Sequence, residues 1–559
     1  MTAAAPASSP GVGAAFPVHV AMAAYVAAAS SSVWAAADRA AAAGHVRAVA
    51  LGGAAYVLTW LLVRRRGGGR TVALAACVMA GAAAGGYFLT QYRHLASPEV
   101  KVAGLDGLGR ALSAPFPRLG SWSPFPNSLA TLLEGLVAPA LGLALARGPA
   151  AVRVAAAAAG VVAALALAVS ASRGAWLAVA VSLAAFAAHR PLVRWPAAFG
   201  AAALAALAAG VAGTVGGGEP WWSRWLDLAG RQDRLDVYLQ AASLLREVPF
   251  TGLGGGDQFA AAVSHYVLLI QVPFITYAHN FSLQAWLEDG LAGLAAWWAL
   301  AAALAVAAVA GERAGLGRRF RGLWAGVLAI HVHGLTDARQ FVDPWTWAPF
   351  FVLAGAVAGF VSRPPCRPPR WAGWAPALVA VVVVAAAVAG RGAPRAAWHT
   401  NRGALDQARA DAEIAAGGDG AGWRAAAAAR FDRAVALAPE DAPSLRRAGI
   451  LALDQGRYAD ASRRLGRAWA AEPGHSPTRK AYGLAAVWTG DTALAVELLR
   501  GVPGMADELT TWSRWRQQRG ETSLALAAAR TALALAPDQP ELGGWVRQLE
   551  AALPDAGAR

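Results

Sequence analysis

Long apolar runs alternate with short polar segments over the first 390 residues of the chain. A helix needs about 20 apolar residues to cross the ~30 Å hydrocarbon layer of a bilayer, and most of the runs approach that length. The pattern predicts an all-α polytopic membrane domain, 1–390, with about eleven transmembrane helices. The predicted spans are about 16–37, 48–63, 71–90, 128–146, 151–170, 174–188, 196–216, 281–310, 322–336, 346–361 and 373–390.

Beyond about residue 391 the apolar positions follow a helical period instead of continuous runs. Segments 438–443 and 472–477 superimpose at a spacing of 34 residues, and a looser third copy runs through 520–537. This period is similar to that of tetratricopeptide repeats, which stack helix hairpins into a superhelix with a concave peptide-binding face. Residues 391–559 are therefore predicted to form a soluble α-solenoid of such hairpins. An alanine-rich helical bundle without a binding function is the alternative.

The first predicted span, about 16–37, differs from a secretory signal peptide. A cleaved signal begins with a basic region, whereas no charged residue precedes Asp38. If this segment crosses the membrane, it is therefore expected to remain in place.

Charge gives the orientation of the spans. Only 15% of the residues are charged and the mean hydropathy is +0.40, which excludes a single soluble domain. The net charge of +15 comes from arginine, because Lys101 and Lys480 are the only lysines. Arginines gather in loops two crossings apart, hence on one face, which the positive-inside rule makes cytoplasmic. The charge therefore implies no nucleic-acid partner. The clusters lie at 64–70, 147–153, 190–194, 313–321 and 363–370.

Two candidate residues lie at span ends on the opposite, outer face. Asn127 opens the fourth span, and Glu134 lies one or two turns inside it. A carboxyl there is costly unless it is paired or hydrated, so Glu134 is either a site residue or bonded to a neighbouring helix. Arg173 begins the sixth span, where it would either reach lipid phosphates or present its planar guanidinium to a phosphate of a ligand.

The large outer loop, 217–280, and the spans after it supply the other candidates. The stretch 231–238 begins an amphipathic helix, on which Arg234 shares a face with Tyr238. A glycine-rich turn follows at 249–256, where backbone amides could bind an anion. His279, at the next membrane boundary, is either a structural histidine or a base that titrates near neutrality.

Together these segments resemble the O-antigen ligase and polymerase superfamily over about 120–360. The Asn127 segment, Ser-Arg-Gly-Ala-Trp at 172–176, the Arg234 helix and His-Asn-Phe-Ser-Leu-Gln at 279–284 occur in the order found there. One departure is Tyr238, where the family commonly has tryptophan. The resemblance implies a metal-independent, inverting glycosyltransferase without a cofactor. It would act on an undecaprenyl-diphosphate-linked glycan at the periplasmic face of a bacterial inner membrane, and the C-terminal tail would be periplasmic.

The resemblance also implies residue roles. Arg173 and Arg234 would bind the donor diphosphate, and His279 would be the general base on the acceptor hydroxyl. The supporting residues would be Asn280, Arg231, Asn127, Glu134 and Asp337. The sequence has no Asp-x-Asp motif, and its two cysteines cannot form a zinc site.

Several acceptors and functions stay open. The acceptor would be the lipid A core, a growing glycan or a protein, the last making the chain a protein O-oligosaccharyltransferase. The repeat tail suggests a protein partner, either an acceptor or part of a polysaccharide assembly. A different class is a non-catalytic scaffold or a transporter of lipid-linked glycan. Transport would favour ionisable residues in mid-span, and the span centres here are nearly uncharged.

Overall fold

The computed structural model is built of helices. No strand occurs among the residues that it describes, and the predicted seventh span, 196–216, lies outside them. The described residues are 13–65, 69–95, 102–120, 125–188, 232–256, 258–263, 277–337, 344–362, 373–389 and 393–553.

Every predicted span within these residues is a helix. By length and composition, α1, α2, α3, α5, α6 and α12 could each cross a membrane, and α7, α15 and α16 are shorter apolar helices. Helix α13 begins with Arg318, Arg319 and Arg321 and is not among the six. These helices confirm the predicted all-α membrane class. Their bounds are α1 Phe16–Ala35, α2 Arg39–Arg64, α3 Gly69–Gln91, α5 Pro126–Ala144, α6 Ala150–Val169, α7 Arg173–Ala187, α12 Phe281–Arg313, α13 Gly317–Gly334, α15 Ala348–Val361 and α16 Ala375–Ala389.

Glycines bring α5 and α13 into close contact. A Cβ at Gly322 would lie 2.6 Å from the carbonyl oxygen of Ala138, and one at Gly142 would lie 2.7 Å from that of Arg318. Small residues of this kind let helix backbones approach in a membrane, where packing rather than hydrophobic burial drives association. The approach sets the N-terminal half of α5 directly beside the C-terminal end of α13.

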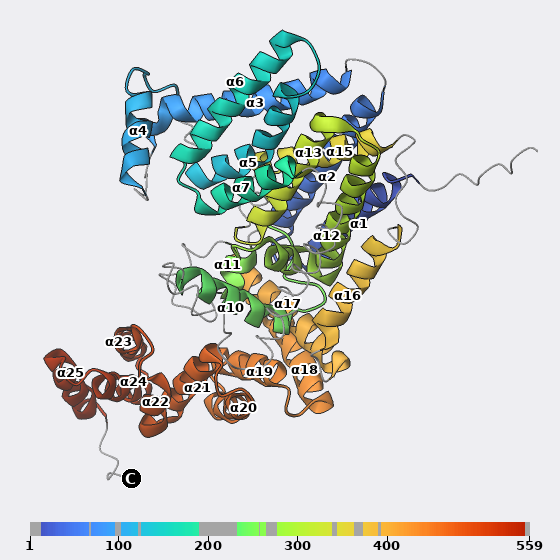
Figure 1. Ribbon diagram of the computed structural model, residues 1–559. Coiled ribbons are helices and arrows are strands. Elements are labelled where there is room, and N and C mark those ends of the chain that lie inside the picture. The colour runs from blue at the N-terminus through green and yellow to red at the C-terminus, as the bar shows by residue number, and fades with distance from the viewer. Residues whose placement is uncertain are drawn as a thin grey trace, which may run out of the picture.

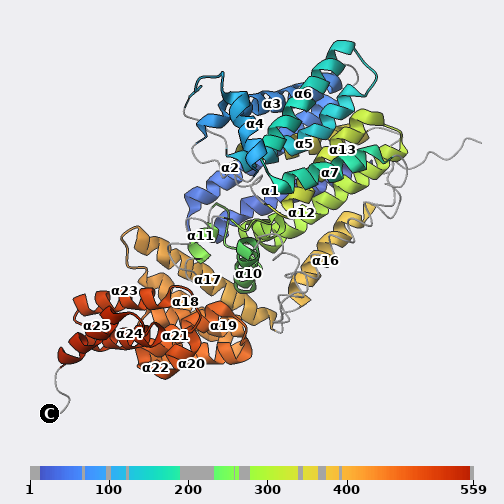
Figure 2. The ribbon, with the colours of Figure 1, turned by 60° about the vertical axis from the view of Figure 1, so that its left-hand side comes forward.

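Short helices lie between this bundle and the C-terminal tail (Figures 1 and 2). Figures 1 and 2 show α10 (Gln232–Glu247) and α11 (Gln258–Val263) between the membrane helices and the C-terminal tail. The remaining short elements are η1 (Tyr92–His94), α4 (Ala103–Ser113) and η4 (Pro344–Thr346).

The turn after α10 fits against a break in α12. Gly290 has φ 68° and interrupts the helix, and the amide of Leu291 donates to the carbonyl of Phe250 at 3.1 Å. The Trp286 indole donates to the carbonyl of Pro249 at 2.7 Å. A Cβ at Gly252, which has φ 61°, would lie 2.5 Å from the Trp286 carbonyl oxygen. Glycine in this turn therefore allows the close backbone approach of α12.

The tail is a row of helix hairpins that extends from the end of α16 (Figures 1 and 2). Equivalent positions 34 residues apart begin and end its helices: Asp441 and His475 cap α19 and α21, and Gly456 and Gly490, both with positive φ, follow them. The bounds are α17 Pro394–Ala415, α18 Ala421–Leu437, α19 Ala442–Asp454, α20 Tyr458–Ala471, α21 Ser476–Thr489, α22 Thr492–Leu499, α23 Met505–Gln518, α24 Thr522–Leu535 and α25 Pro540–Ala551.

The tail also contacts α1. The Arg402 guanidinium lies over the Trp34 ring, 4.8 Å from its centre, and Arg409 donates to the Trp34 carbonyl at 2.7 Å. Trp34 is the penultimate residue of α1, so the first span and the start of the tail lie side by side.

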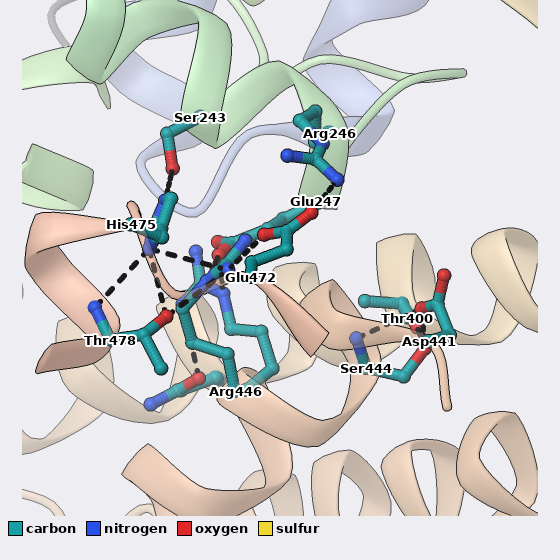
Figure 3. A network of polar contacts seen from close by, with 12 residues as sticks. Ser243, Arg246, Glu247, Thr400, Asp441, Ser444, Arg446, Glu472, His475 and Thr478 are labelled. Atoms are coloured by element: carbon teal, nitrogen blue, oxygen red, sulfur yellow. Dashed lines mark hydrogen bonds and ion pairs between the residues drawn. The ribbon is translucent and has the colours of Figure 1, made fainter. Parts of the chain in front are cut away.

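His475 lies where the tail meets α10 (Figure 3). Its Nδ1 accepts from the amide of Thr478 at 3.2 Å, and its Nε2 lies 2.7 Å from the hydroxyl of Ser243 on α10. Burial, reinforced by the nearby positive charge of Arg446, lowers the pKa of His475 to about 3. Arg246 adds positive charge and Glu247 opposes it. The folded protein therefore holds this imidazole neutral.

This depressed pKa predicts acid sensitivity. The unfolded chain binds a proton near pH 6.5 and the folded one does not, so His475 lowers stability as the pH falls from about 6.5 toward 3. We expect the free energy of unfolding to drop by about 2 kcal/mol more between pH 7 and 5 in the native protein than in His475→Asn. Denaturant unfolding of both proteins in detergent measures this difference. Asparagine preserves the helix-capping acceptor, and equal pH slopes would contradict the prediction.

Candidate active site

Three chain segments meet at the end of the bundle where α7 and α12 begin and α13 ends. A Cβ at Gly174, in the first turn of α7, would lie 2.8 Å from the ring of His333 and 3.0 Å from the hydroxyl of Thr336, so α7 begins against the end of α13. The side-chain amide of Asn280, which caps α12, donates to the carbonyl of Leu335 at 2.9 Å. The starts of α7 and α12 are thereby both held at the C-terminal end of α13.

His279 lies in the middle of this junction. Its Nδ1 is 3.6 Å from a carboxylate oxygen of Asp337, and its side chain is 22% exposed. The Tyr238 hydroxyl donates to the His279 carbonyl at 2.9 Å, and the Tyr277 ring lies 4.2 Å from the imidazole, centre to centre. The separation from Asp337 exceeds a hydrogen bond, but catalytic contacts are often long without substrate. The arrangement is a partly accessible imidazole with a buried carboxylate behind it.

Asp337 is fixed by the backbone at the end of α13. It is 1% exposed, and its amide donates to the carbonyl of His333 at 2.8 Å. A carboxylate held this way can orient an imidazole and stabilise its protonated form. Asp337 and His279, predicted from separate spans, are thus neighbours.

Glu134 pairs with a residue outside the predicted set. Its carboxylate lies 2.5 Å from Nδ1 of His333, and both side chains are buried. This pair corresponds to the alternative in which Glu134 is bonded to a neighbouring helix. His333 in turn contacts the first turn of α7 at Gly174, so the Glu134–His333 pair supports the position at which Arg173 begins its helix.

Arg173 is exposed at the first position of α7. No side chain caps the first turn of α7, and Arg173 forms no ion pair within the part of the chain that the structure describes. Amides at a helix start, together with the macrodipole, favour an anion there. This end of α7 combines a guanidinium with such amides.

Backbone strain marks the same region. Among the described residues, the non-glycine residues with positive φ are Ala171 at 53° and His279 at 49°. Such conformations cost about 1–3 kcal/mol each and are concentrated at functional sites. One strained position is the candidate residue His279 itself, and the other, Ala171, lies two residues before Arg173.

The other predicted residues are described less fully. Arg231 lies outside the described residues, and Arg234 lies in the first turn of α10, with its side chain outside them. Tyr238 follows one turn later and reaches His279, which brings α10 to the site. Asn127 is the second residue of α5, two turns before Glu134, and is half-buried.

Sequence reasoning missed His333 as a site residue. The sequence did offer a signal for this pair: two predicted spans each carry an ionisable residue near the same face of the membrane domain, Glu134 in one and His333 in the other. The neighbouring His331 is structural: its ring stacks on Trp297 at 5.0 Å, and its Nδ1 lies 2.9 Å from the carbonyl oxygen of Val327.

Comparison with known proteins gives two matches. A family model described as O-antigen ligase matches residues 158–298, and one described as tetratricopeptide repeat matches 452–513. No curated protein matches the chain. The first match spans Arg173, Arg234 and His279, whereas Asp337 and the Glu134–His333 pair lie outside it. The second runs from the end of α19 into α23 and confirms the predicted repeats.

Proposed function

We propose that this chain, whose residues 158–298 match a family model described as O-antigen ligase, is a membrane glycosyltransferase that transfers or polymerises undecaprenyl-diphosphate-linked glycan. The observation that carries the proposal is His279 facing the buried carboxylate of Asp337 at the outer end of the bundle. An imidazole with a carboxylate behind it is a general base, and a sugar acceptor hydroxyl needs one.

We propose an inverting displacement. The acceptor oxygen attacks the sugar C1, the bond from C1 to the diphosphate oxygen breaks, and the hydroxyl proton passes to Nε2 of His279. The electron pair of the broken bond leaves on undecaprenyl diphosphate. Asp337, 3.6 Å from Nδ1, stabilises the imidazolium that forms. The reaction written this way uses no metal and no cofactor.

Arg173 and Arg234 are proposed to bind the donor diphosphate. Negative charge grows on the leaving group as the C1–O bond breaks, so guanidinium groups stabilise the transition state more than the ground state. The exposure of Arg173 at the start of α7 supports this role, as does the position of Arg234 one turn before Tyr238. Asn280, Asn127 and Arg231 are proposed as supporting residues.

The site is proposed to face the periplasm from the inner membrane, with the tail on the same side. Two observations support this topology. Two of the arginine-rich segments, 147–153 and 313–321, meet at the other end of the bundle, where Arg318 donates to the carbonyl of Leu145 at 2.8 Å and Arg319 to that of Arg147 at 2.6 Å. The site, α10 and the tail lie together (Figure 2), away from these loops.

Deletion of the gene that encodes this protein, followed by analysis of the lipid-linked and surface glycan of the cells, tests the reaction class. Accumulation of polymer on its lipid carrier would indicate a ligase, with the lipid A core as acceptor, and accumulation of single repeat units would indicate a polymerase. Loss of protein glycosylation alone would indicate the second candidate, a protein O-oligosaccharyltransferase, which the protein-binding character of the repeats favours. An unchanged pool of lipid-linked glycan together with unchanged protein glycosylation would contradict all three. A scaffold would bind donor lipid and leave it intact.

A further inference from the structure

A buried ion cluster joins the repeat tail to the outer helix α10 (Figure 3). Glu247 is the last residue of α10 and is completely buried. One of its carboxylate oxygens accepts from Nε of Arg446 at 2.7 Å, and the other accepts from Nε of Arg447 at 2.5 Å. Both arginines are on α19, and each is less than 4% exposed. The Glu247 carboxylate at the end of α10 thus forms ion pairs with two arginines of the tail.

Neighbouring residues extend this contact along one side of α10. Arg246 forms an ion pair with Glu472, which follows α20, and the Ser243 hydroxyl lies 2.7 Å from Nε2 of His475. Positions three and four apart share a helix face, so Ser243 and Glu247 contact the tail together. The last turn of α10 is therefore enclosed by polar groups of α19 and of the turn between α20 and α21.

A second attachment holds the turn that follows α10. Asn401 on α17 is completely buried, and its side-chain oxygen accepts from the amides of Phe250 at 3.0 Å and Thr251 at 3.2 Å. Its amide group donates to the Thr251 hydroxyl at 2.6 Å. This is the turn that packs against the break in α12 at Gly290. The tail thus contacts both α10 and the turn through which α10 meets α12.

The other end of α10 reaches the proposed site. Arg234 lies about 20 Å along the helix from Glu247, at 1.5 Å rise per residue. Tyr238 lies between them, and its hydroxyl donates a hydrogen bond to the carbonyl of His279 at 2.9 Å. A helix of this length moves as one body, so a shift at its C-terminal end displaces Arg234 and the support of His279 together.

We propose that the repeat tail is a positioning element of the transfer site, which acts by holding α10 through Glu247 and Asn401. The inference rests on the function proposed above. Buried ion pairs add little stability over apolar contacts of the same volume, but they satisfy one geometry only. The cluster therefore fixes the register of α10 on the tail, and Glu247 and Asn401 are positioning residues that do not touch substrate.

Binding of undecaprenyl diphosphate to the purified full-length protein tests this role. Glu247→Gln removes the carboxylate that Arg446 and Arg447 share and leaves Arg446 only its longer ion pair with Glu472 at 3.4 Å, and we expect the Kd for undecaprenyl diphosphate to rise at least tenfold. Removing a negative charge would by itself strengthen the binding of an anionic ligand and lower the Kd. The expected rise in Kd is therefore opposite to the direct electrostatic effect of the substitution. Partial unfolding would reduce the number of binding sites and leave the Kd unchanged.

Two further variants keep the test decisive. Asn401→Ala disrupts the second attachment and is likewise expected to raise the Kd for undecaprenyl diphosphate. If Glu247→Gln cannot be recovered from membranes, the Kd of Asn401→Ala alone tests the proposal. Glu550→Gln removes an exposed tail carboxylate paired with Arg530 and is expected to bind as the native protein does. Native Kd values for both Glu247→Gln and Asn401→Ala would overturn the proposal. Equal binding by the native protein and Arg173→Ala would instead contradict the proposed function.

Discussion

Replacement of His279 with alanine is expected to lower the rate of glycan transfer by about 10²–10⁴-fold. The acceptor hydroxyl then has no group to take its proton as the bond to the sugar forms. Asp337 cannot substitute, because it is buried behind the imidazole position, 3.6 Å from Nδ1. Transfer from extracted lipid-linked donor, assayed in membrane vesicles at equal protein amounts, measures the loss.

Two comparisons separate a lost base from a damaged fold. His399→Ala, in the tail, removes a histidine outside the site and is expected to retain native transfer. Asp337→Asn keeps the base and loses the charge that stabilises its protonated form, so its rate should fall less than that of His279→Ala. Retention of more than a tenth of the native rate by His279→Ala would remove this histidine from the mechanism.

Replacement of Arg173 with alanine is expected to lower transfer by about 10²–10³-fold, the usual loss when one preorganised donor to a developing anion is removed. Arg173→Lys keeps the charge but loses the planar pair of donors that matches a phosphate, so partial activity is expected. Steady-state rates over a range of donor concentrations measure both variants.

The matched control is an exposed arginine at the opposite end of the bundle. Arg153 lies in the first turn of α6, within the arginine cluster 147–153, and donates to the carbonyl of Ala144 at 3.1 Å. Arg153→Ala is expected to transfer glycan at the native rate. Equal losses in Arg173→Ala and Arg153→Ala would indicate a general effect of arginine removal and would exclude a diphosphate site at α7.

The sequence predicted the elements whose signal is local. Spans are long apolar runs, and the hairpins of the tail repeat every 34 residues, so both are legible without knowledge of contacts. Helix α13 is intermediate: the run 322–336 predicted it, but three arginines in its first turns lie within the same helix. The family motifs likewise predicted that Arg173, Arg234 and His279 belong together.

Pairings between distant segments could not be predicted in this way. Arg446 and Arg447 look like the solvated face of a repeat, but they are buried because Glu247, about 200 positions earlier, pairs with both and Glu472 pairs with Arg446. The Glu134–His333 pair is equally invisible in a single sequence. The glycine-rich turn at 249–256 suggested an anion site. In the structure, Gly252 of this turn and Gly290 of α12 allow the backbone of the turn to pack against the backbone of α12. Tertiary contact decides the role of each of these residues.

The contacts of α1 bear on how the chain matures. Ala35, Ala36 and Ala37 form the small-residue pattern that signal peptidase cleaves, directly after the apolar helix. Yet the Tyr25 ring packs against the Trp297 ring, 5.7 Å from centre to centre, and the guanidinium of Arg402 lies over the Trp34 ring. Processing at these alanines would remove a helix that borders α12 and would expose the start of the tail. The N-terminal helix therefore packs as a structural member of the fold, and we expect α12 and the start of the tail to keep these contacts only in a chain that retains it.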